Sequence, residues 1–370
     1  MLIQIHILQN YAPANLNRDD TGSPKDAYFG GFRRGRISSQ CLKRSIRKST
    51  AFIEAFEKCG LLGKRTKLLP DLIAEELKTL HVNSDDIAAI VAQVPQIGHK
   101  GKVTEAEEGE IEKGPAETST RQLIFIGQNE IRPLTEKLLA LYQADPKKWA
   151  KIELEKELDS SLPRSVDIAL FGRMTTSAAF ENIQAAAQVA HAISTNALSQ
   201  EFDYFTAVDD ISGESGAGMI GDVEFNSSTY YKYLNVHWEG LVENLGGDVD
   251  VARQAILALV EAVSVAHPTG KQNSFAAFNL PDLVLIEITS TNLPVSYTNA
   301  FLQPVRASSD RSMMDASVEK LSDYIQRVTR TFNLEGKRAF AATETYSLPG
   351  AESQPSLDHL KTWLDASLPR

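Results

Sequence analysis

Residues 16–49 read LNRDDTGSPKDAYFGGFRRGRISSQCLKRSIRKS. This segment holds nine basic and three acidic residues, a charge of +6, whereas the whole chain carries −10. The rest of the chain therefore carries −16. One concentrated basic segment in an acidic protein is typical of a surface that binds a polyanion. We therefore expect residues 16–49 to form such a surface.

A helix is predicted to begin at Ser38 and Ser39, because serine is a favoured N-cap residue. Projected at about 100° per residue, this helix has an apolar arc and an opposite basic arc. The apolar arc holds Leu42, Ile46, Ser49, Ile53 and Phe56, and the basic arc holds Lys43, Arg44, Arg47 and Lys48. The Gly-rich loop before it adds Arg33, Arg34 and Arg36, and its Gly30-Gly31 pair permits close backbone approach. We interpret this as a phosphate-binding surface; the alternative is a solvated basic face.

The same residues resemble the CasC (Cse4) family, which forms the repeated backbone subunit of Cascade, the type I-E CRISPR surveillance complex. The matching motifs are Leu16–Asp20, Lys25–Gly31 and Arg36–Arg44, then Val166–Leu170 with Gly172–Met174, Ala190–Ile193, Phe205–Asp210, Glu243–Gly247, and Lys271–Gln272 with Ala276–Asn279. The resemblance covers residues 1 to about 300 in register, and only loosely between 60 and 160.

The resemblance implies an α+β fold with a ferredoxin-like (RRM-type) palm, an inserted helical fingers domain and a projecting β-hairpin thumb. The implied boundaries are 1–58, 186–194 and 227–345 for the palm, 59–185 for the fingers, 195–226 for the thumb and 346–370 for a C-terminal tail.

The residue patterns predict individual elements along this framework. Ile3, Ile5 and Ile7 alternate with polar residues and predict a strand with one buried face. A small-residue run from Ser177 to Ile193 predicts a helix, and the glycines within 195–226 predict a hairpin tip. Further helical patterns lie at 72–80, 87–94, 134–144, 149–158, 250–266 and 310–332, strand patterns at 229–238 and 283–288, and an acidic, solvated loop at 98–120.

The resemblance also implies which residues contact a guide RNA. Matching positions in the basic segment are Arg18, Asp20, Lys25, Ser38, Gln40, Lys43, Arg44 and Arg47, and its loop adds Arg36. Matching positions elsewhere are Met174 and Thr176 in the fingers, Tyr204, Phe205 and Thr206 in the thumb, and Lys271 and Arg306 in the palm. For Met174 and Phe205 the alternative is core packing. Contacts of this kind hold phosphates and wedge between bases without reading them, as guides of differing sequence require.

The implied function is that of a non-catalytic backbone subunit without cofactor or metal. Its expected partners are the guide RNA, the target DNA strand paired to it, further copies of itself arranged head to tail, and other Cascade subunits. Copies that stack through a non-closing contact produce a helical filament.

Two other function classes stay open. The pairs Asp19-Asp20 and Asp209-Asp210 could hold Mg²⁺ for phosphodiester cleavage, although we favour turn and cap chemistry for them. An RNA-guided RNA endonuclease would use Asp19, Asp20 or Asp26, and a blander alternative is a free single-stranded RNA-binding protein. The seven histidines show no metal-binding spacing, and His6, in a strand-like segment, is expected to be structural.

Composition favours a globular, cytoplasmic protein. The 370 residues are 42% hydrophobic, and the two cysteines form no CxxC pair, which favours a reducing compartment. The N-terminus does not resemble a signal peptide, and no apolar run is long enough to span a membrane, so no membrane partner is expected.

Overall fold

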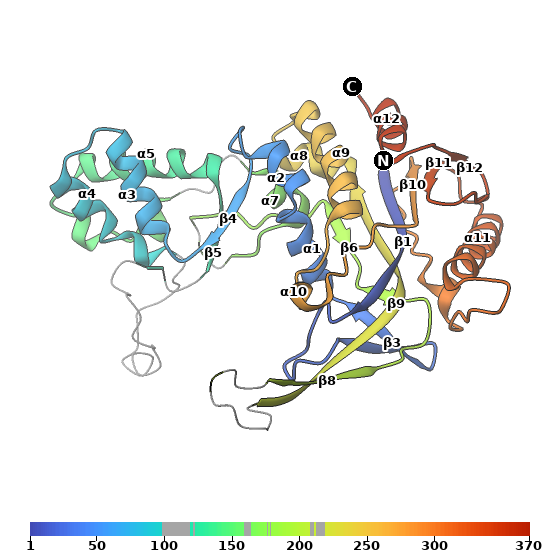
Figure 1. Cartoon of the computed structure of the whole chain (residues 1–370). Coiled ribbons are helices and arrows are strands. Elements are labelled where there is room, and N and C mark those ends of the chain that lie inside the picture. Colours follow the sequence, from blue (N-terminus) through green and yellow to red (C-terminus); the bar gives the residue numbers. More distant parts are fainter. Residues whose placement is uncertain are drawn as a thin grey trace. The chain divides into compact units, whose positions relative to one another are not determined.

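The computed structural model describes residues 1–97, 119–120, 123–158, 164–175, 177, 179–207, 211 and 219–370. The chain divides into two compact units, whose elements are drawn in Figure 1. Unit 1 consists of Met1–Phe52, Ala187–Trp238 and Arg253–Arg370, and unit 2 of Ile53–Ala186 and Glu239–Ala252. The segment predicted as fingers, 59–185, lies within unit 2, and the segments predicted as palm and thumb lie chiefly in unit 1.

Unit 1 is built on a large mixed sheet with the strand order β12-β11-β10-β1-β9-β7-β3-β2, and β6 and β8 pair with further stretches of β9. The strands are β1 Leu2–Ala14, β2 Asp26–Phe29, β3 Phe32–Ile37, β6 Ala187–Val189, β7 Ala192–Ser194, β8 Glu201–Ala207, β9 Met219–His237, β10 Leu283–Thr289, β11 Lys337–Ala342 and β12 Ala351–Ser353. Neighbouring strands in this sheet are antiparallel, except for the parallel β11–β12 pair. The long β9 pairs with β1 over one part and with β8 over another.

The central strand β1 is buried on both faces. It lies between β10, where Leu2 is opposite Thr289, and β9, where Leu2 is opposite His237. The prediction of a single buried face is wrong, because Gln4 and His6 are as buried as the isoleucines between them. Buried polar side chains are tolerated where hydrogen bonds satisfy them.

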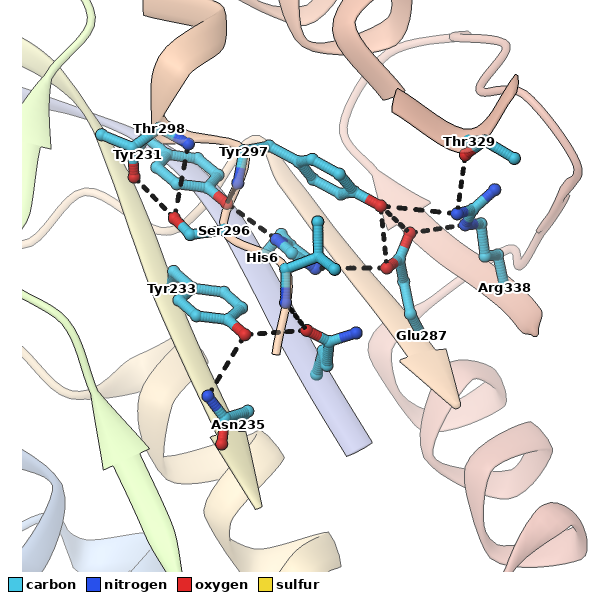
Figure 2. Close-up of polar contacts among 12 residues, drawn as sticks. His6, Tyr231, Tyr233, Asn235, Glu287, Ser296, Tyr297, Thr298, Thr329 and Arg338 are labelled. Atoms are coloured by element: carbon cyan, nitrogen blue, oxygen red, sulfur yellow. Dashed lines mark hydrogen bonds and ion pairs between the residues drawn. The ribbon is translucent and has the colours of Figure 1, made fainter. Parts of the chain in front are cut away.

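Figure 2 shows the polar network around His6 on this face of β1. His6 Nδ1 lies 2.8 Å from the Tyr231 hydroxyl oxygen, and His6 Nε2 lies 3.6 Å from a carboxylate oxygen of Glu287. Glu287 also accepts hydrogen bonds from the Tyr297 hydroxyl at 2.9 Å and from Arg338 Nε at 2.5 Å. His6 is therefore a structural core histidine, as predicted.

Helices cover both faces of this sheet. Successive residues of a strand point to opposite faces, and accordingly Tyr230 packs in one cluster with Leu42 of α1, while Tyr231 packs in another with Leu321 of α11. The helices within unit 1 are α1 Ser39–Arg47, α10 Gln272–Phe275, η4 Thr298–Phe301, α11 Met313–Phe332 and α12 Leu357–Ser367. Three helices contain residues of both units, namely α2 Thr50–Phe56, α8 Trp238–Asn244 and α9 Val249–Val265.

Unit 2 is mainly helical and includes a two-stranded sheet of β4 Gly63–Thr66 and β5 Ile124–Gly127. Its helices are α3 Leu69–Thr79, α4 Ser84–Val91, η1 Val94–Gln96, α5 Gln128–Ala144, η3 Trp149–Lys151, α6 Leu154–Glu157 and α7 Val166–Phe171. Aliphatic side chains of α3, α4 and α5 form its core together with Trp149. The four helical patterns predicted between 72 and 158 are confirmed, whereas the small sheet was not predicted.

The later predicted strands and helices are also confirmed, because β8 pairs with the start of β9 within 195–226, and the rest of β9, α9, β10 and α11 cover the other predicted segments. The glycine-rich hairpin tip predicted between β8 and β9 lies outside the described residues. The helix predicted from Ser177 to Ile193 is wrong. Residues 187–189 form β6 instead, with Ala187 opposite Val236 on β9. The alanines of this run favour a helix intrinsically, but pairing with a central strand overrides that preference.

The predicted basic helix is also shorter than its pattern. It ends at Arg47, and α2 begins at Thr50 after a break at which Ser49 Oγ accepts the Phe52 N–H at 3.3 Å. Of the acidic segment predicted at 98–120, residues 98–118 lie outside the described part of the chain. Among the described residues, no helix has the length and apolar character needed to cross a bilayer.

Candidate nucleic-acid interface

Residues 26–37 of the basic segment form a hairpin and not the predicted loop. Strands β2 and β3 are joined by Gly30 and Gly31, with φ of +62° and +83°. A two-residue hairpin turn of type I′ requires such positive angles at both central positions. A Cβ on Gly30 would lie 2.1 Å from the Leu302 carbonyl oxygen. The close approach predicted at this glycine pair therefore exists, but its neighbour is protein backbone.

Arg34 is fully buried and does not face a ligand, which corrects the interpretation of the loop arginines. Its Nη1 donates to the Ser194 carbonyl at 2.8 Å and its Nη2 to the Phe301 carbonyl at 2.6 Å. Arg33 is exposed but forms an ion pair with an aspartate of β2. Of these three arginines, Arg36 lies nearest to the start of α1.

Helix α1 begins where the sequence predicts. Ser38 Oγ accepts the Cys41 N–H at 3.3 Å, and the Ser38 N–H donates to Asn17 Oδ1 at 2.8 Å. Leu42 is buried against the sheet, while Arg44 is exposed. The positive end of the helix dipole and the exposed Arg44 side chain therefore lie beside residues 16–22.

An open groove of about 670 Å³ lies at this helix start. Its walls are residues 16–22, the first two turns of α1, and the turn at Thr269 and Gly270. Five residues predicted to bind RNA line it, namely Arg18, Asp20, Ser38, Gln40 and Arg44. The predicted Lys271 follows the turn directly, with a left-handed backbone at φ +50°. The fold thus brings residues as far apart in the sequence as Leu16 and Gly270 into one groove.

The loop carboxylates take part in turn chemistry. Asp19 Oδ1 accepts the Thr21 hydroxyl at 2.7 Å and the backbone N–H groups of Thr21 at 2.9 Å and Ser23 at 3.0 Å. The bond from the Thr21 hydroxyl, with those backbone bonds, holds the pKa of Asp19 below its usual value. Asp20 is exposed. The described residues contain no group of three His, Cys, Asp or Glu side chains that could hold a metal ion, and Asp209-Asp210 lies outside them.

His191 contacts the start of α1, although sequence reasoning gave it no role. The Ser39 N–H donates to His191 Nδ1 at 3.2 Å, and Arg36 Nη1 lies 3.4 Å from the same nitrogen. Burial lowers the pKa of His191, and the cations of Arg36 and Lys25 lower it further. The motif Ala190–Ile193 was the available signal, but no spacing rule links it to residue 39.

The predicted thumb is a two-stranded hairpin with every residue of β8 exposed. Tyr204 is 65% exposed and lies opposite Asp222, and Phe205 is 37% exposed and lies opposite Gly221. A Cβ on Gly221 would lie 2.5 Å from the Phe205 ring, so the glycine lets that ring lie against β9. The core-packing alternative for Phe205 is therefore wrong, and Thr206 shares the same exposed strand.

The hairpin is fixed to the groove at its base. Asn15 Nδ2 donates to the carbonyl oxygens of Gly22 at 3.0 Å and Glu224 at 2.9 Å, which joins the groove wall to β9. The sequence of residues 195–226 contains seven acidic residues and no lysine or arginine. A hairpin of this charge repels phosphates, so its exposed rings suit contact with bases.

Met174 belongs to unit 2 and is 96% exposed, so the core-packing alternative is wrong for it too. Its neighbour Arg173 is buried and bonds to Glu130 at 2.7 Å. Gly172 has φ +79°, and a Cβ there would lie 2.9 Å from the Ile183 carbonyl oxygen. This anchored segment presents Met174 to solvent. Thr176 lies outside the described residues.

The remaining predicted positions all belong to unit 1 but do not line the groove. Lys25 and Arg36 lie on the His191 side of the helix start, and Lys43 and Arg47 are half-buried on α1. Arg306 is exposed on the chain between η4 and α11 and is not among the residues that line the groove.

The chain matches the CT1975-like protein family (Cas_CT1975) over residues 3–366. The chain belongs to this family. No curated protein matches it.

Solved structures also match this chain over nearly its whole length, among them two chains of surveillance complexes. A chain of a "CRISPR RNA-guided surveillance complex, pre-nicking" is 29% identical with a TM-score of 0.80, and the match covers 99% of this chain and 100% of that one. A chain of a "CRISPR RNA-guided surveillance complex" is 25% identical with a TM-score of 0.63, and the match covers 99% of each chain. These matches support the Cas assignment made from sequence, at a coarser level than type I-E CasC.

Proposed function

We propose that this protein is a non-catalytic backbone subunit of a type I-E Cascade-like surveillance complex. Copies of the chain add head to tail along the CRISPR guide RNA and present it for pairing with a target DNA strand, in company with other Cascade subunits. Family membership and the full-length similarity to chains of RNA-guided surveillance complexes support this role.

The groove at the start of α1 is the observation that carries the proposal. It brings Arg18 and Arg44 together with the polar side chains of Ser38 and Gln40, although the chain as a whole is acidic. Two cations beside a helix N-terminus suit the phosphates of a strand whose sequence varies. Base identity then stays available for pairing with a target.

The topology of unit 1 supports a ferredoxin-like palm. The order β10-β1-β9-β6 is antiparallel throughout, α1 follows β1 along the chain, and α9 precedes β10. The exposed β8–β9 hairpin suits a thumb that contacts bases, and the exposed Met174 suits a fingers residue that contacts a strand.

The alternative function, that of an RNA endonuclease, requires a loop aspartate whose carboxylate is available for catalysis. Asp19 is occupied by its turn, and Asp26 pairs with Arg33, which leaves Asp20 as the carboxylate to test. The turn bonds of Asp19 and the ion pair of Asp26 favour the non-catalytic proposal.

Binding of labelled single-stranded RNA by the full chain tests the proposal. Two RNAs of equal length and unrelated sequence should bind with the same affinity within about twofold, because the contacts are to phosphates. An RNA duplex of the same sequence should bind more weakly, since paired bases are not accessible to the hairpin rings. Strong preference for one sequence, or for the duplex, would contradict the proposal.

A further inference from the structure

Two side chains accept hydrogen bonds from backbone N–H groups at the start of α1. The first four N–H groups of an α-helix lack partners within the helix. In α1 the Cys41 N–H bonds to the Ser38 hydroxyl, and the Ser39 N–H bonds to His191 Nδ1 at 3.2 Å. The second acceptor comes from a distant part of the chain and is a titratable group.

The sheet sets the position of His191. On paired strands β3 and β7, Arg36 lies opposite Ile193 and Ile37 opposite Ala192. Continuing this antiparallel register by one residue brings His191 opposite Ser38, at the residue where the strand ends and the helix begins. The pairing of β3 with β7 therefore places the His191 imidazole beside the start of α1.

The contacts of His191 Nδ1 define its tautomer. Both the Ser39 N–H and the Arg36 guanidinium are donors, so the nitrogen that faces them must accept. The proton of the neutral ring then lies on Nε2. The charged groups that face the ring are Arg36 from β3 and Lys25 from the segment before β2, and both favour the neutral form.

We propose that His191 is a positioning residue for guide-RNA binding, which holds Arg36 and the first turn of α1 in place through an accepting Nδ1. The inference rests on the proposed function. When the ring is protonated, Nδ1 becomes a donor, so it loses the Ser39 bond and repels Arg36. RNA binding then requires the neutral ring, and acidification weakens it. A histidine that contacted phosphate directly would have the opposite effect, because its positive charge would strengthen binding.

Substitutions of His191 by asparagine and by glutamine distinguish the role of Nδ1 from that of Nε2. In His191→Asn the side-chain oxygen can take the place of Nδ1 and keep the acceptor, whereas His191→Gln places its amide near Nε2. We expect His191→Asn to bind single-stranded RNA within about twofold of wild type at pH 7.5, and His191→Gln to bind at least fivefold more weakly. His359 is a matched control, because its Nδ1 also lies at a helix start, 2.8 Å from Ser356 Oγ. His359→Asn and His359→Gln should both bind as wild type.

The pH profile is the second measurement. Between pH 7.5 and 5.0, wild type should lose affinity relative to His191→Asn, because only wild type can gain a proton at residue 191. Equal profiles, or a gain of affinity by wild type, would overturn the positioning role. The positioning role would also be overturned if His191→Gln bound RNA as tightly as wild type while His191→Asn lost binding.

The tautomer gives a readout that does not depend on RNA. In ¹H–¹⁵N spectra of histidine-labelled full-length protein, the His191 resonance is identified by its absence from His191→Asn. It should show a protonated Nε2 and an unprotonated Nδ1 at pH 7.5. The reverse tautomer would refute the inference even if RNA binds, whereas the expected tautomer in a protein that binds no RNA would refute the proposed function alone.

Discussion

Neutralising the two groove arginines gives a quantitative prediction. Arg18 and Arg44 are both exposed and both line the groove at the start of α1. In the double variant Arg18→Gln/Arg44→Gln, two phosphate contacts are lost. Each contact to single-stranded nucleic acid contributes about 0.7 to the slope of log K against log salt, so the slope should become shallower by about 1.4.

The assay measures the Kd of a labelled single-stranded RNA at several salt concentrations between 50 and 200 mM. Across that fourfold range, wild type should lose about sevenfold more affinity than the double variant. The free energy of unfolding should change by less than about 0.5 kcal/mol per substitution, because both side chains are at the surface.

A control separates local contact from overall charge. Arg330, near the end of α11, and Lys337 on β11 are exposed and do not line the groove. Arg330→Gln/Lys337→Gln removes the same charge and should keep the wild-type slope. Equal slopes for the groove variant and wild type would refute the reasoning, because they would mean that the RNA does not pass through the groove.

Three further predictions concern the same unit. Burial lowers the pKa of Lys232 from 10.5 to about 7, so between pH 7 and 9 the unfolded state binds up to one more proton than the folded state. The free energy of unfolding should therefore rise with pH by up to about 1.4 kcal/mol per pH unit. In Lys232→Met this component of the slope, measured by urea unfolding, should disappear, and an unchanged slope would contradict the burial argument. Gly30→Ala should lower the free energy of unfolding by more than about 2 kcal/mol, since φ is +62° and a Cβ would lie 2.1 Å from the Leu302 carbonyl oxygen. Gly31→Ala has open space around it and should lower the free energy of unfolding clearly less. Equal losses would show that the close contact at Gly30 is relieved. The assembled complex with Mg²⁺ should leave guide-complementary RNA intact; regularly spaced products that vanish in Asp20→Ala would favour an endonuclease.

The sequence predicted elements wherever local pattern and tertiary role agree. Ser38 is a strong N-cap residue, and the apolar arc at Leu42 and Ile46 predicts the buried face of α1, which the structure confirms. The glycines within 195–226 predicted a hairpin, and β8 pairs with β9 there. In these cases residues that are close together in the sequence determine the local structure.

The failures have the opposite cause. Arg34 reads as one more basic residue of the segment, but carbonyl groups of two distant segments surround it in the core. The run around Ala187 reads as a helix, yet it adds to the sheet beside β9. No local pattern encodes these long-range partners.

The candidate site was predictable in composition but not in geometry. Five of its predicted residues line one groove, and their basic and polar character was evident from residues 16–49. The wall at Gly270 and the acceptor at His191 come from segments more than 150 residues away. Only the folded sheet brings them to the start of α1.

The central claim is that copies of this chain assemble along a guide RNA, and mass measurement of the assembly tests it most directly. Full-length protein, in excess over RNAs of 30 and 60 nucleotides, is weighed by native mass spectrometry. A backbone subunit should form discrete complexes whose number of copies about doubles with RNA length, because a head-to-tail contact does not close on itself. A single copy on both RNAs, or a fixed number independent of length, would contradict the account.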